Sequence, residues 1–210
     1  MELLIAVVLM LILMSIVSIL LSRSLSVRAR ERQRTDALTS TAAALNILSR
    51  EIANAGFGVY TSGNRRKASN GILTADSNSQ RIHIRSNFNN VGSHNDDPAT
   101  ATLWNTRDAG EDVTFYYDAA TDSIVRFDPH DTPTTSAIVH RVSNVSFQYF
   151  DYVGLNSAGT QVVTPTNDTG RIRITVTAML DPVYGQPNPS NVTFTTEVAL
   201  RNSNYMLNQY

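Results

Sequence analysis

The chain has 210 residues, 42% of them hydrophobic and 17% charged, and its formal net charge is −1 at pH 7. Such a balance lacks the basic excess that attracts nucleic-acid phosphates, so it argues against a nucleic-acid-binding protein. The absence of cysteine excludes disulfide frameworks, thiol catalysis and cysteine-ligated zinc. This length predicts one globular domain with an appendage.

An apolar run occupies residues 3–21 and is interrupted only by Ser15 and Ser18. As an α-helix it would extend about 28 Å, close to the ~30 Å hydrocarbon core of a bilayer. It lacks the basic n-region, the shorter apolar stretch and the small-residue cleavage site of a secretory signal peptide, so we expect it to belong to the mature protein. Because apolar residues cover every face, a membrane-competent helix is favoured over a buried core helix.

An acid, Glu2, stands directly before this run. A carboxylate inside a bilayer costs about 2.5–3.5 kcal/mol at the centre and less near the edge. Crossing a membrane does not require such a residue, and no base lies beside it in the sequence. Glu2 therefore points to a role other than simple anchoring.

A cluster of arginines with one acid, Glu31, follows the apolar run. These arginines are Arg23, Arg28, Arg30, Arg32 and Arg34. The positive-inside rule would place this flank in the cytoplasm, whereas the cysteine-free remainder, rich in Asn, Ser and Thr, is typical of an exported domain. The arginines are interpreted either as an interfacial anchor or solvated collar, or as partners for acids of neighbouring subunits.

The helix is predicted to continue beyond the membrane segment, because residues 1–55 contain no proline or glycine. Apolar residues then recur at spacings of three and four, which predicts an amphipathic stripe capped at Gly56. The stripe consists of Leu38, Ala42, Leu45, Leu48, Ile52 and Ala55. We expect one helix of about 54 residues and about 80 Å, a length typical of membrane, coiled-coil or assembly roles.

Beyond residue 56 the pattern changes to strands that alternate polar and apolar residues. The predicted strands are residues 81–85, 113–117, 123–127, 138–152, 171–179 and 192–200. The polar loop at 118–122 predicts a hairpin, and 138–152 is either one strand or two strands broken near Ser143 and Asn144. Polar loops that could bind partners are residues 60–70, 87–112, 128–135, 154–170 and 181–191.

The predicted fold class is α+β, with a long N-terminal helix whose C-terminal half packs on a mainly antiparallel β-sheet. Short links between the strands favour antiparallel pairing, and the apolar stripe of the helix can cover one face of the sheet. We expect three segments: a hydrophobic segment at 1–22, its amphipathic continuation at 23–55, and a β-rich head at 56–210.

No catalytic constellation stands out, so we expect no enzyme, no cofactor and no metal site. The four histidines, His83, His94, His130 and His140, are scattered, and zinc-protease, nucleophile-elbow and phosphate-loop motifs are absent. Residues 93–97 gather oxygen ligands that Ca²⁺ prefers but lack EF-hand spacing, so a solvated loop is favoured. Glycosylation sequons occur near chance frequency, at Asn144, Asn167 and Asn191.

Residues 2–7 (ELLIAV), followed by a wholly apolar helix, resemble the N-terminus of type IV pilins and type II secretion pseudopilins. Residues 45–58 (LNILSREIANAGFG), the hairpin around Ala119 and residues 195–202 (TTEVALRN) are similar to W-type minor pilins and J-type pseudopilins. In that family the mature chain begins with phenylalanine and carries a glutamate at its fifth position, which Glu2 matches. Met1 stands where the family has an internal residue, so we expect either that the natural chain begins further upstream or that Met1 is a stand-in or mis-assigned start.

The resemblance implies a structural subunit of a bacterial type IV pilus-like filament, made up of copies of itself or related pilins. It also implies storage in the inner membrane, a prepilin peptidase, N-terminal methylation, an assembly machinery, and pairing of Glu2 with the N-terminal amine of a neighbouring subunit. The expected assembly residues are Glu2, Leu3, Leu4, Ile5, Val8, Leu11, Ile12, Arg23, Arg28 and Arg30. Many major pilins carry glycine and proline roughly where Leu11 and Ile19 stand, so we expect a more continuous helix here.

Two other interpretations of the sequence are possible besides a filament subunit. The chain could be a minor pilin or a pseudopilin of a type II secretion-like system, which the subgroup resemblance favours. It could instead be a lone membrane-anchored binding domain that uses the loops at 87–112 and 154–170. If the chain is a filament subunit, a basic leader removed on the cytoplasmic side would balance the arginines and leave the head outside. No residue of the sequence distinguishes between roles in adhesion, motility, DNA uptake and secretion.

Overall fold

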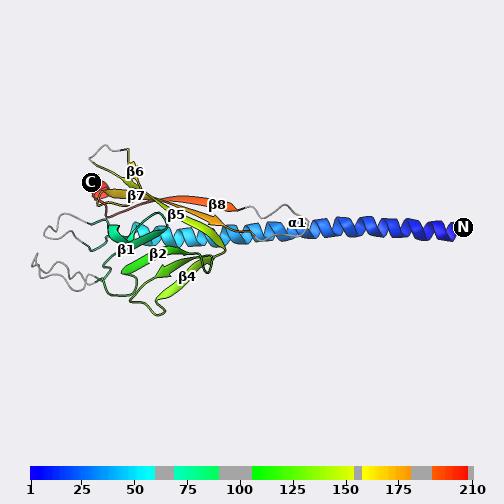
Figure 1. The fold of residues 1–210 in the computed structure, drawn as a ribbon, viewed down its shortest axis with the longest axis horizontal. Helices are drawn as coiled ribbons and strands as arrows, with labels where there is room; N and C mark the ends of the chain where they lie inside the picture. The colour runs from blue at the N-terminus through cyan, green and yellow to red at the C-terminus, as the bar shows by residue number, and fades with distance from the viewer. Residues whose placement is uncertain (60–68, 90–105, 154–157, 181–190, 208–210) are drawn as a thin grey trace, which may run out of the picture.

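The computed structural model describes residues 1–59, 69–89, 106–153, 158–180 and 191–207. Its elements in chain order are α1 (Glu2–Ala53), the 3-10 turn η1 (Thr74–Asp76), β1 (Arg81–Arg85), β2 (Asp112–Asp118), β3 (Ser123–Phe127), β4 (Thr135–His140), β5 (Val142–Asp151), β6 (Thr160–Val162), β7 (Thr169–Ala178), β8 (Val192–Ala199) and α2 (Asn204–Leu207). The head surrounds only the C-terminal part of α1, and the rest of the helix projects from it (Figure 1). The predicted α+β, pilin-like architecture is confirmed.

Helix α1 is continuous over 52 residues, as the absence of proline and glycine predicts. It ends slightly earlier than expected, because Asn54 rather than Gly56 is the C-cap and its amide bonds to the carbonyls of Glu51 and Ile52. Gly56 instead adopts a φ of +78° and lets the chain turn closely against Gly71. The turn brings the Gly56 amide within 2.8 Å of the Arg85 carbonyl and so joins the end of α1 to β1.

The strands form two four-stranded antiparallel sheets, in the orders β1-β2-β3-β4 and β6-β5-β7-β8. The antiparallel direction was expected, but the division into two sheets was not. The division occurs at Arg141, whose φ of +64° breaks the predicted segment 138–152 into β4 and β5. Strand β6 lies inside the predicted loop 154–170, and three residues are too few to produce a recognisable alternation.

The buried face of α1 differs from the predicted stripe at its first two positions. Leu38 is 50% exposed and Ala42 is exposed, so the prediction is wrong for both residues. The buried face that contains Leu45, Leu48 and Ile52 extends toward the N-terminus through Ala44 and Thr41. These two residues precede Leu48 by four and seven positions and therefore lie on the same side of the helix. Leu38 lies one turn before Thr41, the first α1 residue that the head buries.

The core lies between this face of α1 and the inner faces of the two sheets. Its largest fully buried sheet residues are Ile82, Phe115, Ile124, Phe147, Tyr149, Ile172 and Ile174. The Tyr149 hydroxyl donates a hydrogen bond to the Asn78 carbonyl at 2.8 Å, which satisfies its polar end. Burial raises the pKa of Tyr149 well above its usual value. The core thus holds α1 in one position relative to both sheets.

Candidate functional site

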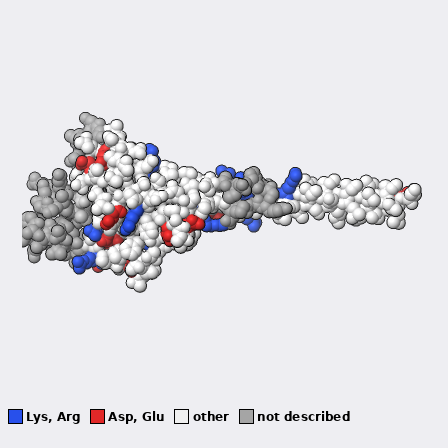
Figure 2. Space-filling model, in the orientation of Figure 1, with Lys and Arg blue, Asp and Glu red and all other residues white. Residues whose placement is uncertain are grey.

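The candidate site is the part of α1 that projects from the head. An 18-residue window of this helix has a mean hydropathy of 3.2 and none of it is buried, so the helix can span a membrane by length and composition. The expected assembly residues of the apolar segment, Leu3, Leu4, Ile5, Val8, Leu11 and Ile12, are between 46% and 80% exposed. Figure 2 shows this length of the helix free of charged side chains up to its N-terminal end. The single chain therefore leaves an uncharged cylinder, apolar except for Ser15 and Ser18, that no described residue buries.

Glu2 lies in the first turn of α1 and is exposed. The unpaired amides at the start of a helix carry partial positive charge, so an acid is electrostatically favourable there. Among the residues that the structure describes, no cationic side chain pairs with Glu2. The carboxylate is thus available to a charge supplied from outside the chain.

The arginine collar (Arg23, Arg28, Arg30, Arg32 and Arg34) follows the apolar segment along α1. Arg23, Arg28, Arg32 and Arg34 are exposed and form no ion pair with a described residue, whereas Arg30 is half-buried and has a contact within the chain. At 1.5 Å per residue the collar extends about 17 Å along the helix. Arg28 and Arg32 share one side of the helix, and the other three recur at spacings of seven and four on another side. The collar therefore presents cations in two directions.

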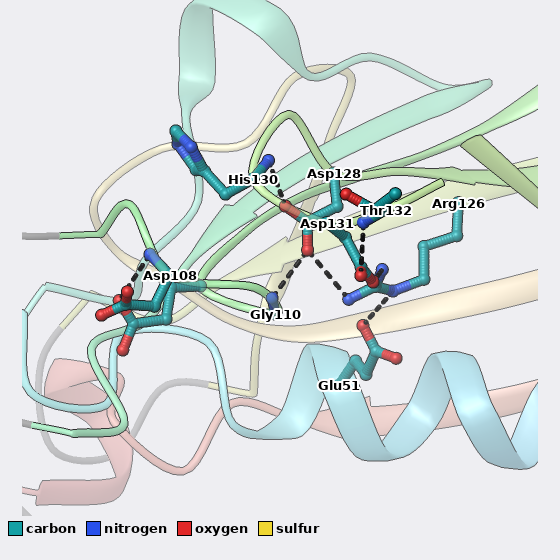
Figure 3. Close-up of polar contacts among 9 residues, drawn as sticks. Glu51, Asp108, Gly110, Arg126, Asp128, His130, Asp131 and Thr132 are labelled. Atoms are coloured by element: carbon teal, nitrogen blue, oxygen red, sulfur yellow. Dashed lines mark hydrogen bonds and ion pairs between the residues drawn. The ribbon is translucent and has the colours of Figure 1, made fainter. Parts of the chain in front are cut away.

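An ion network joins the end of α1 to the first sheet (Figure 3). Arg126 of β3 donates from Nε to Glu51 at 3.2 Å and from Nη2 to Asp128 at 3.3 Å, and its Nη1 lies 3.4 Å from Asp131. The fully buried Asp128 also accepts the amides of Gly110 at 2.6 Å and His130 at 2.9 Å. Because every one of these charges has a partner, the network positions α1 without leaving a buried ion unpaired.

The chain after β8 provides a second attachment between the head and α1. The Arg201 amide donates to the Ala53 carbonyl at 3.2 Å, and the Asn202 side chain donates to the Ala55 carbonyl at 3.0 Å. The Ala53 carbonyl belongs to the last residue of α1, where helix carbonyls otherwise lack partners, and Ala55 lies just beyond the C-cap Asn54. The head and the projecting helix are therefore joined from two sides.

A cavity of about 190 Å³ marks the end of the head that faces the N-terminus. Its lining includes Gln33 and Thr41 of α1, His140 at the end of β4, and Arg141 and Met179 beyond the ends of β4 and β7. The Thr41 hydroxyl and the Gln33 side-chain oxygen are buried there without a hydrogen-bond partner among the described residues. This cavity is where α1 leaves the head.

A further cluster of titratable groups surrounds His83 of β1. Its Nδ1 lies 3.1 Å from Asp76, its Nε2 bonds to Asp112 of β2, and Arg85 lies 3.0 Å from the other oxygen of Asp112. Burial disfavours the charge on Asp112, but hydrogen bonds from His83 and Arg85 outweigh it and hold the pKa of Asp112 below its usual value. These groups pair with one another across β1 and β2, so their geometry fits a structural role.

The remaining sequence-predicted positions are not brought together. His130 and His140 are exposed on separate segments, as are the sequon residues Asn144, Asn167 and Asn191. Within the described residues, no group of three or more His, Cys, Asp or Glu side chains could hold a metal ion. The oxygen-rich residues 93–97 lie outside the described part of the chain.

Comparisons with protein families, curated proteins and solved structures find no match for this chain. Two of the four segments on which the resemblance to pilins rests, 2–7 and 45–58, lie at the two ends of α1, and the second continues five residues past Ala53. Residues 2–7 begin the exposed apolar segment, and residues 45–58 form the buried end that joins the head. The pilin-like character of the chain is therefore a property of its architecture.

Sequence patterns did not predict the contact between Arg126 and Glu51. Asp128 and Asp131 follow Arg126 closely in the sequence, which is a usable signal for a local ion cluster. Glu51 is 75 positions away from Arg126, and no spacing rule connects a helix to a strand at that separation. Only the packing of α1 on the first sheet brings these two charges together.

Proposed function

We propose that this protein is a structural subunit of a type IV pilus-like extracellular filament, held in the inner membrane by α1 before assembly. One observation carries the proposal: the first part of a continuous helix, residues 3–21, is uncharged and exposed on every side, and it follows an acid, Glu2, that pairs with no described cationic side chain. A simple anchor needs only the apolar residues, because an acid opposes burial in lipid.

Assembly would transfer α1 from lipid into a bundle of identical helices. Lipid tails are as apolar as leucine, so this transfer gains little hydrophobic energy and depends on close packing and polar contacts. The predicted contact residues Leu3, Leu4, Ile5, Val8, Leu11 and Ile12 supply side chains that can interdigitate with a neighbouring helix. Such packing alone does not select one stagger between neighbours.

Glu2 would select the stagger by pairing with the N-terminal amine of a neighbouring subunit. Opposite charges attract far more strongly in a low-dielectric bundle than in water. A buried ion pair adds little net stability, but a buried charge that misses its partner is strongly penalised. Only the stagger that joins the two charges avoids this penalty.

Arg23, Arg28 and Arg30 would complete the interface at the outer end of the apolar segment. Guanidinium groups brought together in a bundle repel one another unless carboxylates lie between them. We assign acidic residues of neighbouring heads to this role in the filament. In the membrane-held state, Arg23 lies close enough to Leu21 to reach the headgroup region, since two residues of helix extend only about 3 Å.

Electron microscopy of sheared extracellular material, with mass spectrometry of the fibres, tests the proposal. We expect fibres with this protein as the repeating subunit, helices in the centre and heads outside. Sub-stoichiometric protein at fibre ends would assign it to the minor-pilin or pseudopilin class instead. Protein confined to the membrane fraction, with no fibres, would support a lone anchored domain and refute the filament.

A further inference from the structure

The two sheets have four edges, and one of them, at β8, is long and open as far as the described residues go. The edge at β1 is covered by the segment that contains Ile72 and Leu73, through the Ile72–Ile84 bridge and a bond from the Leu73 amide to the His83 carbonyl. The edge at β6 is only three residues long, whereas the edge at β4 is regular over residues 135–137 and shifts register only where β4 pairs with Ile124 and Val125. Short length, cover and bulges are the usual means of blocking edge-to-edge association.

Strand β8 is long, has no bulge in its pairing with β7, and is not covered through backbone hydrogen bonds by any described residue. It pairs with β7 over eight residues without a register shift and contains no proline, lysine or arginine. The Leu200 amide bonds to the Gly170 carbonyl at 2.9 Å, which fixes which backbone groups of β8 face β7. By alternation, the amides and carbonyls of Thr193, Thr195, Glu197 and Ala199 point away from β7. No described residue bonds to them.

The directions of β4 and β8 relative to α1 are opposite. Strand β4 begins beside Arg126, the partner of Glu51. It ends at His140, which lines the cavity where α1 leaves the head. Strand β8 begins opposite Ala178, which lines the same cavity. The chain then leads to Arg201, whose amide donates a hydrogen bond to the carbonyl of Ala53 at the C-terminal end of α1. Strand β4 thus runs toward the N-terminal end of the helix and β8 runs away from it.

These two edges also lie on different sides of the helix. Figure 1 shows β8 along one side of α1 and β4 along the other, and both strands contact α1. The Asp128 amide bonds to the Thr134 carbonyl at 2.8 Å, so by alternation the backbone groups of Thr135 and Ala137 point away from β3. Both flanks of the head therefore offer outward-facing strand groups.

We propose that in the filament the open edge of β8 pairs with the β4 edge of a second copy, so that one sheet continues from subunit to subunit. This inference rests on the proposed filament, in which all copies point the same way. When the α1 helices of two copies are parallel, β8 of one copy and β4 of the next run antiparallel to each other. Every described strand pair within one copy is also antiparallel. Two β8 edges could meet antiparallel only if the copies pointed in opposite directions.

The contact joins two different surfaces, so it is heterologous and leaves an open β8 edge at one end of the array and an open β4 edge at the other. Such contacts build open helical arrays rather than closed dimers. Backbone hydrogen bonds would supply the attachment, as in other cases where a strand is added to a sheet edge. Pairing of the heads would also protect the β8 edge from association with unrelated chains.

Hydrogen exchange of the full chain, as detergent-solubilised monomer and as filament, tests the inference directly. The amides of Thr193, Thr195, Glu197 and Ala199 should exchange at least about tenfold more slowly in the filament. The amides of Thr196 and Val198 face β7 and should be protected in both forms, which makes them internal controls. Filaments in which the four outward amides still exchange rapidly would overturn the edge pairing and leave the filament proposal intact, whereas a chain that never forms filaments would overturn both.

A matched pair of variants isolates the backbone contribution. Thr195→Pro removes an outward amide that the monomer does not use, and edge strands tolerate proline at such positions. We expect it to fold and insert like the wild type but to lower filament yield about tenfold, whereas Thr195→Ala should assemble normally. Normal assembly of a folded Thr195→Pro variant would overturn the inference; if this variant does not fold, exchange of the wild-type filament decides.

Cysteine cross-linking identifies the register of the contact, and the chain has no native cysteine to interfere. Ala137→Cys is combined in turn with Thr193→Cys, Thr195→Cys and Glu197→Cys. We expect one of the three pairs to give a disulfide-linked ladder from oxidised filaments, and none of the single variants to do so. Filaments in which no pair cross-links would count against the contact between β8 and β4.

Discussion

Arg126 and Glu51 form an ion pair with a 3.2 Å separation between Nε and the carboxylate, although one belongs to β3 and the other to the last turn of α1. Arg126 also lies between Glu51 and the fully buried Asp128 (Figure 3). The pair joins the filament-forming part of the molecule, as we propose it, to the sheet that carries β4. A force on α1 therefore reaches the head through a charged contact as well as through the core.

Removal of Arg126 should destabilise the head strongly. Arg126→Gln would leave Asp128 buried with only its two backbone amide donors, and we expect a loss of about 3 kcal/mol in the free energy of unfolding. Urea unfolding of the full chain in detergent, followed by near-UV circular dichroism, measures the change. Arg81→Gln is the control, because Arg81 is exposed and forms no ion pair with a described residue; equal effects of the two changes would contradict the network's role.

Gly71 should not tolerate a side chain, because it packs against the turn that ends α1. A Cβ on Gly71 would come within 2.0 Å of the Gly56 amide nitrogen and 2.5 Å of the Arg85 carbonyl oxygen, and its φ is +73°. We expect Gly71→Ala to cost more than about 3 kcal/mol.

Gly110 provides the matched comparison for Gly71. Its φ is +90°, but the nearest atom to an added Cβ is Nη2 of Arg126 at 3.9 Å, an ordinary van der Waals distance. Gly110→Ala should therefore cost only about 1–2 kcal/mol, the cost of the backbone conformation alone. Thermal unfolding of both variants separates the steric clash from the conformational cost, and similar melting temperatures would show that the turn relaxes.

Thr41→Val should stabilise the protein. The Thr41 hydroxyl is fully buried and has no hydrogen-bond partner among the described residues, whereas valine has nearly the same shape and no polar group to satisfy. We expect a gain of about 1 kcal/mol in the free energy of unfolding. Thr39→Val, at an exposed position whose hydroxyl bonds to the Thr35 carbonyl, should change stability by less than about 0.5 kcal/mol. A destabilised Thr41→Val variant would indicate that the hydroxyl has a partner.

The carboxylate of Asp112 should make the stability of the head depend on acid pH. Its pKa is lowered from the ordinary value of 3.8, so its contribution is fully present above that value and is lost as the pH falls through the lowered pKa of the folded state. At pH 7 Asp112→Asn should cost about 1–3 kcal/mol, and the difference from the wild type should shrink below pH 4.

Unfolding midpoints between pH 2 and pH 7 measure this dependence. Asp168→Asn is the control, because Asp168 is exposed and its side chain has no bond to a described residue; its curve should run parallel to that of the wild type. A constant gap between Asp112→Asn and the wild type across this range would refute the assignment.

Glu2→Gln should separate membrane insertion from assembly. Loss of the charge makes the apolar segment easier to insert, so we expect wild-type levels in the membrane fraction. Filament yield should fall at least about tenfold, since the stagger-setting charge pair is lost. Quantification of sheared fibres by electron microscopy gives the readout, with Ser15→Ala as a control that alters the same helix without removing a charge. Wild-type fibre yield from Glu2→Gln would show that the acid does not set the stagger.

Local patterns predicted most of the elements, because each of them depends on neighbours in the sequence. The continuous helix follows from the absence of breakers before residue 56, and β1 was predicted with its observed bounds. The hairpin between β2 and β3 was also predicted, with its turn at residues 118–122. By contrast, the short strand β6 was missed and the buried face of α1 was displaced at Leu38 and Ala42, because these depend on what packs against them.

The sequence by itself determined that the chain has a membrane-length apolar helix with an acid at its head, since helix formation and hydropathy depend only on local composition. Tertiary structure decided how that helix is held and which surfaces remain open. The pairing of Glu51 with Arg126, the change of sheet at Arg141 and the free edge of β8 all depend on residues far apart in the chain. Their positions are set by the packing of both sheets around α1, and no local pattern contains that information.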